Sequence, residues 1–130
     1  MSVLEATYDY ETLQVNSVDD LSALLDTVAS LPLPTWLELA TPQGDVLLIG
    51  LGADFSSLRF TEARDDGRTY HSSATLDSPQ DAEFQFGTVP TAMDTGSALT
   101  VTEARAAAAE FLQTARRPER VAWKLVDGHT

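Results

Sequence analysis

The sequence predicts an α+β fold: an antiparallel sheet of about five to seven strands with two helices packed on one face. Two helical patterns, one near each end of the chain, enclose a central region of short apolar segments separated by turn residues. A length of 130 residues suits a single domain over 1–130. Hydrophobic residues make up 43% of the chain, which is enough to build a folded core.

The N-terminal third predicts a strand followed by a helix. Residues 3–10 alternate weakly and contain two tyrosines, which favours a strand. Ser17 is the expected N-cap of the helix, with acidic residues in the first turn, where the helix dipole favours them. The apolar residues that follow have the spacing of three and four that defines one helical face; they are Val18, Leu21, Leu24, Leu25 and Val28. Pro32 and Pro34 end this helix.

The centre of the chain changes to the period of strands. The predicted strands are residues 35–40, 46–51, 57–61, 69–74 and 83–86. Short turns join them, including a hairpin signal at residues 65–67, so an antiparallel meander is expected.

The last third predicts a second helix and a final strand. Thr100 and Glu103 have the spacing of a capping box, and the alanine-rich segment 101–114 favours a helix. Pro118 ends this region, and residues 120–125 form the expected last strand.

The charge of the chain is its most unusual property. There are 20 acidic residues against 8 basic ones, a formal net charge of -12. No Lys or Arg occurs from Met1 to Leu58; the acids of that segment are Glu5, Asp9, Glu11, Asp19, Asp20, Asp26, Glu38, Asp45 and Asp54. Such a field repels nucleic acid and anionic lipid and favours a cationic protein partner. The alternative is that the acidity serves only solubility.

Residues that carry chemistry are sparse, so no catalytic, metal or cofactor site is predicted and the chain is not expected to be an enzyme. The sequence has no cysteine, and its histidines are His71, which has no second ligand nearby, and His129 in the tail. Ser72 follows His71 directly, and neighbouring side chains on a strand point to opposite faces. The pair Gly50 and Gly52 is followed by neither a helix nor a third glycine, so it does not predict a dinucleotide loop.

The N-terminal segment has no basic region and no long apolar run, so it does not resemble a secretory signal. No segment approaches the roughly 20 apolar residues that a membrane-spanning helix needs. A cytoplasmic location without membrane contact is therefore expected.

The ordered motifs of the chain resemble one known family. They are Trp36-Leu37-Glu38-Leu39, Leu48-Ile49-Gly50-Leu51-Gly52, Leu58-Arg59-Phe60, Tyr70 with Ser72, the helix 101–114, Arg117-Pro118, and Val121-Ala122-Trp123. In order and spacing this set is similar to the first numbered immunity protein family of bacterial polymorphic toxin systems. That family usually has glycine where Ala115 stands. Alanine there either takes the left-handed conformation at a modest cost or ends the helix differently.

The resemblance implies a cytoplasmic antidote that binds and neutralises a cognate toxin, often a nucleic-acid deaminase, by covering its basic substrate or active site. It implies a toxin domain as the partner. We expect a monomer or weak dimer as the working form, with no cofactor.

The partner-binding residues are predicted from chemistry, since the family motifs are mostly core residues. Acids on the strand-rich part and one aromatic residue are the candidates; they are Tyr70, Asp65, Asp66, Asp77, Asp81 and Glu83. The alternative functions are an acidic adaptor or secretion chaperone, which would be dimeric, and an enzyme with a pocket between sheet and helices.

Overall fold

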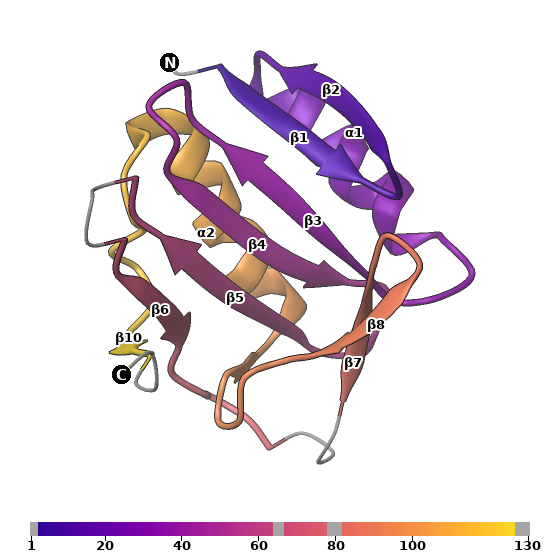
Figure 1. Cartoon of the computed structure of the whole chain (residues 1–130), viewed down its shortest axis with the longest axis vertical. Coiled ribbons are helices and arrows are strands. Elements are labelled where there is room, and N and C mark those ends of the chain that lie inside the picture. Colours follow the sequence, from indigo (N-terminus) through magenta and orange to yellow (C-terminus); the bar gives the residue numbers. More distant parts are fainter. Residues whose placement is uncertain (1–2, 64–66, 78–81, 127–130) are drawn as a thin grey trace.

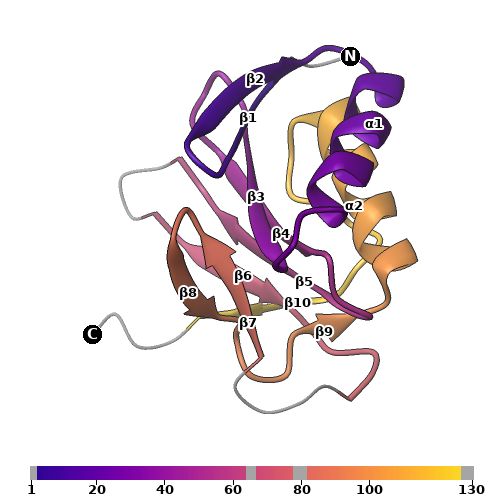
Figure 2. The same ribbon diagram turned by 90° about the vertical axis from the view of Figure 1, so that its right-hand side faces the viewer.

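A computed structural model of the chain describes residues 3–63, 67–77 and 82–126. One curved sheet carries two helices, which lie side by side on the same face (Figures 1 and 2). The helices are α1 (Val18–Ala29) and α2 (Val101–Thr114). The strands of the described residues are β1 (Leu4–Tyr8), β2 (Glu11–Val15), β3 (Thr35–Ala40), β4 (Val46–Leu51), β5 (Ser56–Thr61), β6 (Thr69–Ser72), β7 (Glu83–Phe86), β8 (Val89–Ala92), β9 (Ala98–Leu99) and β10 (Trp123–Leu125). The predicted α+β class is confirmed, although these ten strands exceed the number predicted.

The main path of the sheet runs β10-β6-β5-β4-β3-β1-β2, and each neighbouring pair on it is antiparallel. The meander from β3 to β6 is therefore as predicted, but the fifth predicted strand, β7, does not continue it beside β6. The β7–β8 hairpin joins β3 through one parallel bridge, Thr35 with Gln85, and β9 pairs with β5.

The N-terminal strand continues into a hairpin that the sequence did not predict. β2 pairs with β1 in a register that places Tyr8 opposite Glu11. Asp9 and Tyr10 form the two-residue turn, both with positive φ, 47° and 65°. This is the backbone of a turn that usually contains Asn-Gly, so Asp-Tyr is a weak turn signal. β2 is mostly exposed, so its sequence lacks the alternation of apolar and polar residues by which a strand is recognised.

Helix α1 begins as predicted, and its predicted apolar face is buried except for Val18, which is 38% exposed. The Ser17 hydroxyl accepts a hydrogen bond from the Asp20 backbone N–H at 3.0 Å. The buried face consists of Leu21, Leu24, Leu25 and Val28.

Helix α2 has the predicted capping box, in which Glu103 and Thr100 each accept from the backbone N–H of the other. It ends at Ala115, which adopts the left-handed conformation with φ 57° and ψ 25°. Of the two possibilities for Ala115 that the sequence left open, the structure has the left-handed helix ending. The Ala115 backbone N–H donates to the Phe111 carbonyl at 2.8 Å.

The core lies between the sheet and the helices. It is built from alternate residues of the central strands, whose other residues point to the opposite face. The strand residues that face the helices are Leu37, Leu39, Leu47, Ile49, Leu51, Leu58 and Phe60. Phe111 of α2 packs edge-on against Phe60, with ring centroids 5.9 Å apart. Trp123 of β10 extends this cluster, at 6.2 Å from Phe60.

The opposite face of the sheet, called here the open face, is covered at one end by the β7–β8 hairpin (Figure 2). Phe84 anchors the hairpin: its ring lies over Gly50 and contacts Trp36 at a centroid distance of 4.9 Å. A Cβ on Gly50 would lie 2.7 Å from the Phe84 ring, so glycine in the middle of β4 makes room for this contact.

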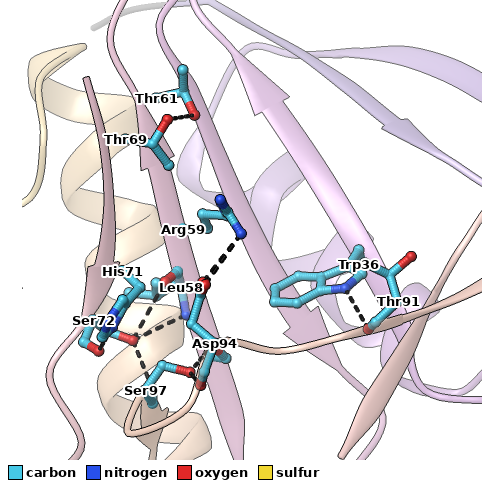
Figure 3. Close-up of polar contacts among 11 residues, drawn as sticks. Trp36, Leu58, Arg59, Thr61, Thr69, His71, Ser72, Thr91, Asp94 and Ser97 are labelled. Carbon is cyan, nitrogen blue, oxygen red and sulfur yellow. Dashed lines mark hydrogen bonds and ion pairs between the residues drawn. The ribbon is translucent and has the colours of Figure 1, made fainter. Parts of the chain in front are cut away.

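Polar contacts complete the attachment of the hairpin and the segment after it (Figure 3). The Trp36 indole N–H donates to the Thr91 carbonyl at 3.4 Å, and Arg59 on β5 pairs with Asp94 at 3.2 Å. The buried hydroxyl groups of Ser57 and Ser97 share a hydrogen bond of 2.6 Å. The hairpin is therefore fixed to the sheet by buried aromatic packing and by hydrogen bonds.

Glu110 on α2 fixes the connection from α2 to β10. Its carboxylate accepts hydrogen bonds from the backbone N–H groups of Glu119 at 2.7 Å and Arg120 at 3.3 Å, and from the Arg120 side chain at 3.1 Å. Burial on its own raises the pKa of Glu110, but these hydrogen bonds outweigh it and lower the pKa below 4.5.

We expect Glu110→Gln to lower the free energy of unfolding at neutral pH by about 1–2 kcal/mol, because a charge-assisted acceptor is lost. The folded-state pKa of Glu110 is lowered, so its contribution is present above pH 4.5 and is lost as the pH falls through the lowered value. Urea unfolding of both proteins from pH 7 to pH 3 checks this. A stability difference that does not shrink below pH 4.5 would contradict the assignment.

Candidate partner-binding surface

The charge asymmetry of the sequence becomes a spatial asymmetry in the fold. The strand order places β4, β3, β1 and β2 together on one side of the sheet. This side comes from the segment without Lys or Arg, and so does α1. The β7–β8 hairpin comes from a second segment without bases, between Arg68 and Arg105. One side of the molecule is therefore built from elements that carry no bases, and several of them carry acids.

Several of the described basic side chains are engaged within the protein. Arg105 pairs with Asp26 at 2.8 Å, which joins α2 to α1. Arg59 and Arg120 pair with Asp94 and Glu110, as described above. Arg117 lies over the Tyr70 ring, 4.1 Å from its centroid. These internal partners leave the acidic excess to dominate the surface field.

Three loops meet at one end of the base-free side. They are the β1–β2 turn at residues 9–10, the α1–β3 connection at 31–34 and the end of the β7–β8 hairpin at 86–89, together called the three-loop tip (Figure 1). A groove of about 390 Å³ runs between them, lined by Asp9, Leu31, Pro32, Leu33, Thr35, Gln85, Gly87 and Thr88. The Tyr10 hydroxyl contacts the Thr88 hydroxyl at 3.2 Å across the first and third loops.

The three-loop tip exposes large apolar side chains: Tyr10 is 74% exposed, Val89 59%, Leu33 57% and Phe86 44%. The other exposed large apolar residues of the described chain are spread out: Val3 lies just before β1, and Leu13, Val18 and Leu125 lie on β2, α1 and β10. Single exposed apolar residues need no explanation, but a group of them indicates a binding surface.

The structure separates the site residues that the sequence predicted. Tyr70 on β6 faces the helix side, is half-buried against the core and lies under Arg117. Glu83 is exposed at the start of β7, in the hairpin over the open face. Asp77 is exposed in the segment after β6. Asp65, Asp66 and Asp81 lie outside the described residues.

The residues of the three-loop tip were not among the predicted site residues. A signal for one loop was present, because Gly87-Thr88 between apolar residues fits a two-residue hairpin turn with glycine first. The proximity of the three loops depends on the tertiary fold.

A second hollow, of about 580 Å³, lies where α2 ends and is lined by Asp45, Phe60, Glu62, Ala115, Arg116, Arg117, Pro118, Glu119, Val121 and Trp123. In the parts of the chain that are described, no group of three or more His, Cys, Asp or Glu side chains is placed to hold a metal ion. Nor does any described helix have the length and apolar character needed to cross a membrane.

An α+β fold whose base-free side ends in loops with exposed aromatic and aliphatic residues has the surface features of a protein-binding domain. The family comparison makes this class specific: the Imm1 immunity protein family matches residues 9–125, so the chain belongs to that family. No curated protein matched the chain in a separate comparison. The resemblance inferred from the ordered motifs is thus confirmed.

Proposed function

We propose that this immunity protein neutralises a cognate toxin by binding it, without catalysis, and by covering a basic substrate-binding or active-site surface. A nucleic-acid-acting toxin of the deaminase type fits this role best, because a protein that acts on nucleic acid needs a basic groove. The observation that carries the proposal is the base-free side of a family member with net charge -12.

The electrostatics favour such a partner. A surface of one sign attracts an oppositely charged protein over distances near the Debye length and increases the association rate. An antidote benefits from rapid association because the toxin acts while it is free. We place the action in the cytoplasm of the producing cell, with one immunity protein per toxin domain.

We propose the three-loop tip and the acids near it as the contact surface. Asp9 and Glu11 are the acids that adjoin the tip. Asp77 and Glu83 are exposed and remain in the proposed set, although Glu83 lies at the start of β7, at the end of the hairpin away from the tip. Arg117 already covers one face of the Tyr70 ring, so Tyr70 is less suited to be the main anchor than we expected from sequence.

The test uses the toxin domain encoded by the neighbouring gene, refolded after separation from its immunity protein. We expect inhibition of the toxin by one equivalent of the protein and an association rate that falls as salt increases. The double variant Asp9→Asn/Glu11→Gln should slow association roughly three- to tenfold. The matched control Glu62→Gln/Glu119→Gln removes the same charge beside the second hollow and should change the rate less.

Absence of binding and of inhibition would refute the proposed function. Equal slowing by both double variants would show that net charge acts without a defined surface. A stable dimer that binds an unfolded segment of the partner would instead support the adaptor or secretion-chaperone alternative.

A further inference from the structure

Tyr10 is the most exposed large apolar side chain of the described residues, yet it is held in place. Its ring lies over Gly87, where an added Cβ would be 2.7 Å from the hydroxyl oxygen. The hydroxyl shares a 3.2 Å hydrogen bond with the Thr88 hydroxyl and accepts a longer one, 3.4 Å, from the Thr88 backbone N–H. A side chain that is exposed and already ordered loses little conformational entropy on binding.

The backbone at Tyr10 indicates that its side chain has a use beyond the turn. Both turn residues have positive φ, a conformation that costs non-glycine residues roughly 1–2 kcal/mol each. Glycine would form the turn more easily, and the exposed Tyr10 ring contributes little to the core. Strain of this kind at an exposed aromatic residue is typical of binding sites.

The surroundings of Tyr10 specify what it can contact. Leu33 and Val89 extend the apolar surface from the two adjoining loops, and the groove between the loops is lined partly by Pro32. Exposed Asp9 and Glu11 flank Tyr10 directly in sequence. All three loops come from segments without Lys or Arg. An apolar centre with an acidic rim complements an apolar pocket with a basic rim.

We infer that Tyr10 is the anchor of partner recognition: its ring enters an apolar pocket on the toxin domain, and basic residues at the rim of that pocket meet Asp9 and Glu11. This inference rests on the proposed function and specifies the surface that performs it. Aromatic anchors surrounded by polar rims supply most of the affinity in protein interfaces. Tyr10 therefore determines the lifetime of the complex, whereas the acids determine how quickly it forms.

The experiment measures association and dissociation rates of Tyr10 variants with the toxin domain encoded by the neighbouring gene. We expect Tyr10→Ala to weaken affinity on the order of thirtyfold, mainly through faster dissociation. Tyr10→Phe keeps the ring and should retain most of the affinity. Leu125→Ala is the matched control, because Leu125 is 56% exposed on β10, at the other end of the strand order.

Tyr10→Gly separates binding from folding. Glycine relieves the positive φ of 65°, so the melting temperature should be no lower than that of Tyr10→Ala while binding is equally weak. Equal affinities for Tyr10→Ala and Leu125→Ala would overturn the anchor while leaving toxin neutralisation intact. Failure of the unaltered protein to bind the toxin would instead remove the proposed function itself.

Discussion

Replacing Phe84 by alanine is expected to lower the free energy of unfolding by about 3–5 kcal/mol, the range for a fully buried phenylalanine. The Phe84 side chain is 1% exposed and packs against Trp36 and, edge-on at 6.1 Å, against Phe55. Gly50 offers no side chain to fill the space that is left. Urea unfolding followed by tryptophan fluorescence measures the loss, since Trp36 lies beside the changed position.

The same substitution should also weaken toxin binding, because Phe84 holds the hairpin that carries residues 86–89 of the three-loop tip. We expect the affinity of the folded variant to fall at least about tenfold. A loss in the free energy of unfolding of less than about 1 kcal/mol would be no larger than many surface substitutions cause. That result would show that Phe84 does not anchor the hairpin.

Replacing Phe111 by alanine is the second large expected effect, again about 3–5 kcal/mol in the free energy of unfolding. Phe111 is 0% exposed on α2 and meets Phe60 between the helix and the sheet. Gln113 is exposed on the same helix, so Gln113→Ala should change stability by less than about 0.5 kcal/mol.

The two phenylalanines form a comparison because they lie on opposite faces of the sheet. At a temperature where each variant remains folded, Phe111→Ala should bind the toxin with nearly unchanged affinity, since Phe111 lies on the helix face of the sheet and is not one of the residues of the three-loop tip. A loss of affinity equal to that of Phe84→Ala would contradict a binding surface at the tip and would point to general loosening of the fold.

The elements that the sequence predicted well are those whose local pattern and final burial agree. Helix α2 has the predicted bounds because its capping box, alanine content and terminal Pro118 are all local signals. Strands β3 and β4 also have the predicted bounds. Their runs of apolar residues are mostly buried in the structure, as the sequence pattern indicated. The last strand begins at Trp123 rather than residue 120, because pairing with β6 extends only that far.

The elements that the sequence missed depend on pairing between distant segments. β2 is exposed except at Val15, so it lacks a pattern and exists because β1 supplies its hydrogen bonds. β8 contains Pro90, which argues against a strand, yet a proline fits in a strand that pairs with one neighbour. β9 is a two-residue segment that pairs with β5.

By itself, the sequence determined the α+β class, the two capped helices, the base-free N-terminal half and the resemblance to the Imm1 family. Each of these depends only on residues that are close in the sequence, on motif order or on composition. Only the tertiary structure decided that Tyr70 is stacked under Arg117 and that Tyr10 is exposed at the three-loop tip. The physical reason is that the exposure of a side chain, and which loops lie next to it, depend on how distant strands pair and on how the β7–β8 hairpin packs on the sheet. Residues 9–10, 31–34 and 86–89 meet only after the sheet has formed and Phe84 has packed over Gly50.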